Sequence, residues 1–274
     1  MRIGIIGGRG GMGTLFSRIF SDAGHEVLVS GRATPLSNAD LVRACEVVIV
    51  SVPIRSTVPV IREIAPLLSG DQLLCDFTSL KAASVAAMLE TRADVLGLHP
   101  MFGPSVSSLQ NQTIVACPAR VAPGRADVLL AVFREAGAKV TTMDPLEHDR
   151  LMAVVQGLTH FTTLSLAGAM RRLSVDLPAL LSVTSPVYQI EMAVIGRILG
   201  QDPGLYGPIL GENPAVPEVL DAFEAAAAEV RGAVESGDDE VFARLFNKDA
   251  AFFADYIPHA TEDSEALIRC LAEK

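Results

Sequence analysis

The sequence predicts an α/β domain with a mostly parallel sheet, followed by an all-helical domain. In the first half, short apolar runs rich in Val, Ile and Leu alternate with helix-length segments, which is typical of strands covered by helices on both faces. In the second half the strand-like runs stop and only helix-length segments remain. We place the boundary near Asp144, which gives domains of residues 1–144 and 145–274.

Seven strands are expected in the first domain. Their apolar character is nearly continuous, as in strands that a parallel sheet buries on both faces. The expected strands are Arg2–Gly7, Glu26–Ser30, Val47–Val52, Leu73–Phe77, Val95–Leu98, Ile114–Cys117 and Lys139–Met143.

A long linking helix is expected to begin after the last strand. Asp144 suits the N-cap, Pro145 the first helical position, and Glu147 completes a capping box. The helix should run to about Leu173. Gly, Pro and Asp residues separate the later helices, which we expect at Leu177–Leu199, Val216–Glu235, Asp239–Tyr256 and Glu262–Glu273.

The overall composition indicates a globular chain. Of its 274 residues, 50% are hydrophobic and 20% are charged, and the formal net charge is −10. Duplex binding needs a basic face, so no nucleic-acid partner is expected. No apolar stretch reaches the ~20 residues that cross a bilayer, and Met1 and Arg2 lead directly into a strand, without room for a signal peptide. We therefore expect a soluble, cytoplasmic protein with no membrane partner.

The cysteines give no sign of a metal site. Cys45, Cys75, Cys117 and Cys270 are far apart in the sequence and share no C-x-x-C spacing. Most lie in apolar surroundings, where a cysteine behaves as a small hydrophobic residue. We expect structural thiols and no zinc.

A glycine-rich loop follows the first expected strand. Gly8, Gly10 and Gly13 form a G-x-G-x-x-G pattern that opens the first helix. These glycines permit a tight turn and a close approach to a pyrophosphate, and the N–H groups at the helix start favour the anion. The pattern therefore predicts a Rossmann-type dinucleotide site. Its expected residues are Gly8, Arg9, Gly10, Gly11, Met12 and Gly13, with Ser30, Arg32, Val52 and Pro53 at the ends of the next two strands.

The choice of cofactor depends on the end of the second strand. NAD enzymes usually carry Asp or Glu there to hold the ribose hydroxyls. This chain has Ser30-Gly31-Arg32 instead. Ser30 can donate to a 2′-phosphate and Arg32 can pair with it, which favours NADP over NAD. The alternative is that Arg32 is a solvated turn residue.

Three further segments follow strands: Ser51–Ile54, Asp76–Lys81 and Gly97–Pro104. Ligands of open α/β sheets gather at the carboxyl ends of the strands. His99 is a titratable side chain at such an end, in a stiff loop rich in Pro and Gly, and is a candidate for acid–base chemistry. Alone, it would more simply be a loop histidine bonded to backbone groups.

Taken together, these segments resemble the prephenate dehydrogenases, which oxidatively decarboxylate prephenate or its relative arogenate. The run Leu98-His99-Pro100-Met101-Phe102-Gly103-Pro104 is the most specific match. The other matching stretches follow the family's order along most of the chain: Gly7–Phe16, Val48–Ile54, Asp76–Lys81, Glu147–Phe161 and Ser185–Arg197.

The resemblance implies roles for individual residues. His99 matches the catalytic histidine, which accepts the proton of the substrate's ring hydroxyl, and Ser79 matches the serine that hydrogen-bonds it. Arg197 matches the arginine that binds the ring carboxylate. His160 matches a histidine associated with the mouth of the active site and with inhibition by tyrosine. Gln189 stands where some relatives carry an arginine, which leaves open how the side-chain carboxylate is held.

The residues around Arg197 support its assignment independently. Residues 190–199 contain no other basic residue and are mostly apolar apart from Glu191. A guanidinium there is costly unless it is paired, and a bound carboxylate would be such a partner. An internal ion pair with Glu191, or a side chain that reaches solvent, is the alternative.

A polar face is expected on the linking helix. His148, Met152, Gln156 and His160 recur every four residues and would share that face. Gln156 and His148 are candidates to line a cleft, although a solvated surface would look the same. Asp149 is expected to support a neighbouring side chain or to carry a helix-terminus charge.

The implied activity is hydride transfer to NAD(P)⁺ coupled to decarboxylation, in tyrosine biosynthesis, with His99 as the base. The sequence leaves open prephenate, arogenate or an amino-substituted analogue. The alternatives are a hydroxyacid dehydrogenase, a deazaflavin-linked NADP reductase, or a non-catalytic dinucleotide sensor. None of these is expected to carry His99, Ser79 and Arg197 together.

A homodimer is expected through the second half of the chain. The Ala-rich segment Ala222–Ala228 and the Phe-rich segment Phe242–Phe253 offer apolar surface that one chain does not cover. Tyrosine is a possible feedback inhibitor by the same resemblance.

Overall fold

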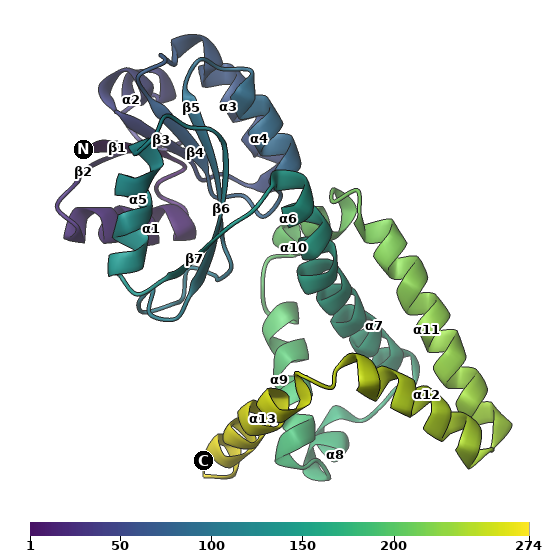
Figure 1. The fold of residues 1–274 in the computed structure, drawn as a ribbon. Coiled ribbons are helices and arrows are strands. Elements are labelled where there is room, and N and C mark those ends of the chain that lie inside the picture. The colour runs from purple at the N-terminus through teal and green to yellow at the C-terminus, as the bar shows by residue number, and fades with distance from the viewer. Residues whose placement is uncertain (274) are drawn as a thin grey trace. The chain divides into compact units, whose positions relative to one another are not determined.

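The computed structural model describes residues 1–273 and divides into two compact units. Unit 1 comprises Met1–Met152 with Gly211–Asn213, and unit 2 comprises Ala153–Leu210 with Pro214–Lys274. Figure 1 shows that unit 1 holds the sheet and that unit 2 is helical.

Unit 1 is built on a seven-stranded sheet of order β2-β1-β3-β4-β5-β6-β7. All neighbouring strands are parallel except β5 and β6, which are antiparallel. The predicted mostly parallel α/β fold is therefore confirmed. The strands are β1 (Arg2–Ile6), β2 (Glu26–Ser30), β3 (Val47–Val50), β4 (Leu73–Asp76), β5 (Asp94–Pro100), β6 (Thr113–Arg120) and β7 (Lys139–Thr142).

Helices cover both faces of this sheet, because alternate strand residues point to opposite sides. On one face, Phe16 and Phe20 pack with Phe133, whereas Leu41 and Ile61 belong to the core of the other face. The strands are apolar on both sides for this reason. The helices of unit 1 are α1 (Gly11–Asp22), α2 (Asn38–Ala44), α3 (Ile54–Ile64), η1 (Ala65–Leu67), α4 (Ala82–Leu89), α5 (Arg125–Glu135) and α6 (Pro145–Met152).

Unit 2 differs from the expected helices in two places. The helix expected at Leu177–Leu199 is broken, because Pro186 cannot continue a preceding helix and instead starts a new one. The helix Pro203–Gly211 was not expected, because its many Gly and Pro residues suggest a turn. The elements are η2 (Ala153–Leu158), α7 (Thr159–Arg172), α8 (Leu177–Ser182), α9 (Pro186–Leu199), α10 (Pro203–Gly211), α11 (Val216–Ser236), α12 (Asp239–Phe252) and α13 (Ile257–Ala272).

The linking helix is not one regular α-helix. A π-helical segment, η2, separates α6 from α7. Its wider turn changes the helical phase, so a four-residue spacing no longer keeps side chains on one face. His148 is accordingly fully buried, whereas Gln156 and His160 are half-buried. The division between the units falls at Met152, whereas the sequence analysis assigns all of this helix to the second domain.

Within residues 1–273, no helix combines the length and apolar character needed to cross a membrane.

Candidate active site

The glycine-rich loop joins β1 to the start of α1. Gly7 has a φ of +83°, which only glycine adopts readily, and a Cβ there would lie 2.2 Å from the carbonyl oxygen of Ser51. A Cβ on Gly13 would lie 2.6 Å from Cα of Gly8. At Gly10, the N-cap, no side chain caps the helix, and the first turn has no acidic residue. This tight cradle and its helix N-terminus fit a dinucleotide pyrophosphate.

The end of β2 is the next part of the expected dinucleotide site, where the ribose of the cofactor would be held. Ser30 is fully buried, and its hydroxyl donates to Oδ1 of Asn38 at 2.8 Å. The donor role expected for Ser30 toward a 2′-phosphate therefore requires this bond to be broken. Arg32 is exposed, and Arg9 donates to the carbonyl of Ala33 at 2.8 Å. Arg32 thus lies on this short segment, and the guanidinium of Arg9 reaches it from the glycine-rich loop.

His99 lies in β5, one residue before the strand ends at Pro100, and is 2% exposed. The loop after it packs against the glycine-rich loop. A Cβ added to Gly11 would lie 2.8 Å from Cγ of Pro104. The loop that follows the candidate base therefore adjoins the start of α1 at the candidate phosphate loop, within unit 1.

A chain of hydrogen bonds runs from His99 to a carboxylate on α6. Nδ1 of His99 lies 2.8 Å from Nε2 of His148, and Nδ1 of His148 lies 2.8 Å from Oδ1 of Asp149. The carboxylate also accepts backbone N–H groups of Lys81 at 2.8 Å and Ala82 at 2.9 Å, where α4 begins. Burial lowers the pKa of His99 well below its ordinary value, and the electrostatic effect of Lys81, and of His148 when that ring is protonated, acts in the same direction.

The loop after β4 holds a buried ion pair. The ammonium group of Lys81 contacts Oδ2 of Asp76 and donates to the carbonyl of Leu98 at 2.8 Å, and both charged side chains are fully buried. Burial raises the pKa of Asp76, although the charge of Lys81 opposes the rise. Ser79 is half-buried in the same loop. This pair ties the end of β4 to the residue before His99.

In unit 2, His160 packs against Tyr206. The rings of His160 and Tyr206 meet edge to face with centroids 4.8 Å apart. Nδ1 of His160 is buried without a hydrogen-bond partner in the described chain, and burial lowers the pKa of this histidine. Burial raises the pKa of Tyr206, and the charge of Arg197 opposes that rise. Tyr206 is therefore in ring contact with His160 and is influenced by the charge of Arg197.

Arg197, Gln189 and Gln156 are the other residues expected to bind the substrate. Arg197 is exposed, and no ion pair joins it to Glu191 in the described part of the chain. Gln189 is exposed and makes only a long contact, 3.5 Å, with Thr184. Gln156 lies half-buried in the π-helical segment.

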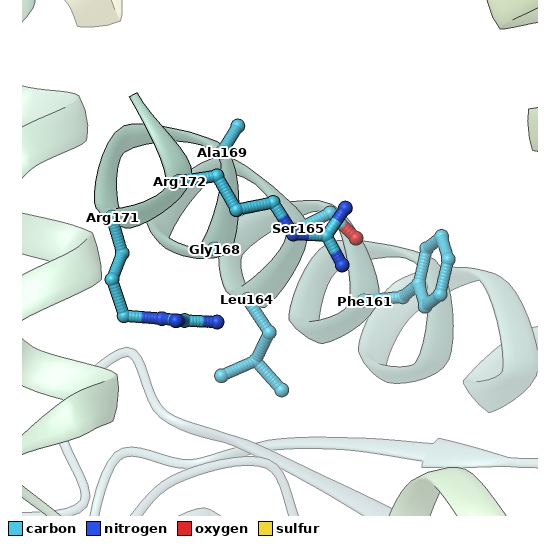
Figure 2. A pocket seen from close by; sticks show the side chains of 7 residues that line it. All are labelled: Phe161, Leu164, Ser165, Gly168, Ala169, Arg171 and Arg172. Carbon is cyan, nitrogen blue, oxygen red and sulfur yellow. The ribbon is translucent and has the colours of Figure 1, made fainter. Parts of the chain in front are cut away.

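A hollow of about 400 Å³ lies along α7 and contains none of the expected site residues. Figure 2 shows its lining side chains on this one helix, with two arginines at the carboxyl end. The lining residues are Phe161, Leu164, Ser165, Gly168, Ala169, Arg171 and Arg172.

Known proteins match both parts of the chain. Residues 23–142 match the prephenate dehydrogenase nucleotide-binding domain, and residues 144–248 match the prephenate dehydrogenase dimerization domain. The chain is 34% identical to the T-protein of Haemophilus influenzae over 98% of this chain and 71% of that protein. The chain belongs to the prephenate dehydrogenase family.

Other members agree with this assignment. The chain is 36% identical to a probable arogenate/prephenate dehydrogenase of Methanocaldococcus jannaschii, over 75% of this chain and 50% of that protein. Among solved structures, prephenate dehydrogenase from A. aeolicus, in complex with hydroxyphenyl propionate and NAD⁺, superposes with a TM-score of 0.76. That match covers 93% of this chain and 98% of the other at 19% identity, and it supports the shared fold.

In this family member, the structure divides the expected residues between the two units. Unit 1 holds His99, Ser79 and the residues expected to bind the cofactor: Gly8, Arg9, Gly10, Gly11, Met12, Gly13, Ser30, Arg32, Val52 and Pro53. Unit 2 holds the residues expected to bind the substrate: Gln156, His160, Gln189 and Arg197. No group of three or more His, Cys, Asp or Glu residues in the described chain could hold a metal ion.

Sequence reasoning missed several residues that the structure places beside these. It did not select Asn38, Lys81, Asp76 or Tyr206. The pairing of Asp76 with Lys81 could have been predicted, since two opposite charges directly after an apolar strand are expected to pair when buried. Tyr206 could not have been predicted, because it lies among Gly and Pro residues in a segment that resembles a turn.

Proposed function

We propose that this protein oxidises and decarboxylates prephenate, with hydride transfer to NAD(P)⁺. The observation that carries the proposal is the position of His99: a buried imidazole at the carboxyl end of β5, with a lowered pKa, followed by a loop whose Pro104 meets the glycine-rich loop at Gly11. A neutral histidine at this place can act as a general base toward a substrate bound next to a nicotinamide.

The proposed chemistry begins at the ring hydroxyl of the substrate. When bound, the nicotinamide supplies the hydride acceptor. His99 accepts the hydroxyl proton as the hydride leaves the same carbon, so that carbon becomes a carbonyl. The bond to the ring carboxylate then breaks, carbon dioxide leaves, and its electron pair completes the aromatic ring. The phenolate oxygen takes the proton back from His99, which returns the base to its starting state.

The substrate's charged groups need cationic and polar partners. We propose Arg197 for the ring carboxylate, since its guanidinium has no carboxylate partner within the described chain. His160, Gln156 and Gln189 are proposed to contact the remainder of the substrate, and Ser79 to hydrogen-bond His99. Among the described residues, none is a hydrogen-bond partner of the buried Nδ1 of His160, which suits a ligand contact.

For the cofactor we propose a preference for NADP. Arg32 and Arg9 place two positive charges where an NAD enzyme usually has a carboxylate, and no acidic residue stands at the end of β2. The buried bond between Ser30 and Asn38 argues for the arginines rather than Ser30 as the main phosphate ligands.

Steady-state kinetics with each substrate and each cofactor test this proposal. Reduction of NADP⁺ should follow addition of prephenate, with one 4-hydroxyphenylpyruvate and one carbon dioxide for each cofactor reduced. Faster turnover of arogenate, or of an amino-substituted analogue, would identify that compound as the substrate of the same reaction. Reduction with a 2-hydroxy acid or a reduced deazaflavin, and none with prephenate, would favour the other reductases. Cofactor binding without any turnover would favour a sensor.

We further propose a homodimer formed through unit 2, with tyrosine as an inhibitor. The phenylalanines of α12 and the segment after it are exposed in the single chain, Phe252 by 84% and Phe246 by 63%. A stable protein rarely leaves such a cluster uncovered. Sedimentation should show twice the chain mass, and a monomer would contradict the proposal. Added tyrosine should raise the KM for prephenate.

A further inference from the structure

The hydrogen-bond chain behind His99 determines which atom of that ring can act as the base. Its three members, His99, His148 and Asp149, all belong to unit 1 and lie on β5 and α6. His99 is 2% exposed, His148 is fully buried and Asp149 is 5% exposed. Water therefore has little access to these bonds, and the donors and acceptors must match one another.

Asp149 determines which atoms donate and which accept along this series of hydrogen bonds. Its Oδ1 accepts the N–H of Lys81 and its Oδ2 accepts the N–H of Ala82, both in the first turn of α4. Backbone N–H groups can only donate, and a helix start favours a negative charge. Asp149 is thereby held as a carboxylate. Its Oδ1, 2.8 Å from Nδ1 of His148, must accept, so the proton lies on Nδ1 of His148.

The position of that proton then fixes the next ring. When His148 is neutral, its imidazole has one donor and one acceptor nitrogen, so Nε2 of His148 is the acceptor. Nδ1 of His99, 2.8 Å away, must donate to it. The lone pair of neutral His99 is therefore on Nε2.

We propose that Asp149 and His148 are positioning residues that hold His99 in the Nδ1–H tautomer, so that Nε2 is the atom that takes the substrate's proton. This proposal rests on the proposed function only in giving His99 the role of base. The tautomer itself follows from the hydrogen-bond geometry together with a neutral His148.

The same hydrogen bonds, from His99 through His148 to Asp149, stabilise His99 after it accepts a proton. The charged groups that face this region are Lys81, Asp76 and Asp149, besides His148 itself. Lys81 is already paired with Asp76, so Asp149 is the carboxylate left to balance a new positive charge, acting through His148. Loss of His148 should therefore slow the proton transfer and leave substrate and cofactor binding intact.

Nitrogen NMR of the histidine-labelled holoenzyme with NADP⁺ tests the tautomer directly. The signals of His99 are assigned by their loss in the His99→Asn variant. We expect a protonated Nδ1 and a pyridine-like Nε2 at neutral pH. A protonated Nε2 with a pyridine-like Nδ1 would overturn the proposal, whether or not the enzyme turns over prephenate.

Two variants of His148 separate positioning from packing. The amide of His148→Gln reaches the place of Nε2 and can accept from His99, whereas the amide of His148→Asn reaches only the place of Nδ1 and keeps the bond to Asp149. We expect His148→Gln to retain kcat within about tenfold of the wild type, and His148→Asn to lose about 10²-fold, the cost of misplacing a catalytic group. The KM for prephenate should be unchanged in both.

The exposed His259 on α13 provides the control, since His259→Gln should change neither kcat nor the NMR signals of His99. Equal kcat losses in the two His148 variants, with equal thermal stability, would contradict the positioning role. If both variants misfold, the NMR tautomer of the wild type still decides the proposal. If the wild type shows the expected tautomer but does not oxidise prephenate, only the proposed function fails.

Discussion

Nδ1 of His99 and Nε2 of His148 lie 2.8 Å apart inside unit 1, where both rings are buried. The contact joins the end of β5 to α6, so the first residues of the linking helix belong to the sheet-containing unit. The contact gives the candidate base a fixed orientation, and burial gives it a low proton affinity. Several consequences can be measured.

The first concerns pH. Burial lowers the pKa of His99 below its ordinary 6.5, and nearby positive charge lowers it further. A base works only when it is unprotonated, and a lowered pKa keeps it so at lower pH. As pH falls, kcat/KM for prephenate should therefore stay level through 6.5 and decline only below it. A decline centred at or above 6.5 would contradict the assignment.

Arg197→Ala should weaken substrate binding. A hydrogen bond to a charged group contributes about 1.5–3 kcal/mol, so the KM for prephenate should rise roughly 10- to 100-fold with a smaller change in kcat. Arg231→Ala is the control, since this arginine pairs on the surface with Glu235. An unchanged KM in Arg197→Ala would remove this arginine from the site.

Gly13→Ala should damage the cofactor loop. The added Cβ would lie 2.6 Å from the backbone of Gly8, and such overpacking costs about 1–3 kcal/mol. The Kd for NADP⁺ should rise and the Tm should fall. Gly232→Ala, on α11 with open space around its Cβ, should leave cofactor binding unchanged and raise stability slightly. Normal NADP⁺ binding in Gly13→Ala would argue against a pyrophosphate at this loop.

Arg32→Ala should change the cofactor preference. Loss of a guanidinium that pairs with a 2′-phosphate should raise the KM for NADP⁺ about tenfold or more, and leave the KM for NAD⁺ unchanged. Arg18→Ala, an exposed position on α1, controls for the general loss of positive charge. Parallel changes for both cofactors would contradict the proposed phosphate contact.

Features that depend on local patterns could be predicted from the sequence. All seven strands could be predicted because burial on both faces leaves continuous apolar runs. The glycine-rich loop could be predicted because its tight turn leaves no space for side chains. The break at Pro186 has a local cause and could have been predicted from the restriction that proline imposes. The π-helical turn at residues 153–158 could not, since no residue there marks it.

Features that depend on distant contacts could not be predicted. Asp149 binds the backbone of Lys81, which lies 68 residues earlier in the sequence, and this contact gives the carboxylate its role. The regular four-residue spacing suggested instead that His148 lines a cleft together with Gln156. The edge-to-face contact of His160 with Tyr206 likewise joins separate helices, and neither local sequence predicts it.

The rate of prephenate-driven NADP⁺ reduction in His99→Asn decides whether His99 is the base. The asparagine amide can keep the bond to His148 but offers no group at the position of Nε2, so the change removes the base and little else. We predict an unchanged Kd for NADP⁺ and a fall in kcat of roughly 10²- to 10⁴-fold, the usual contribution of a general base. A kcat near that of the wild type would contradict the central claim.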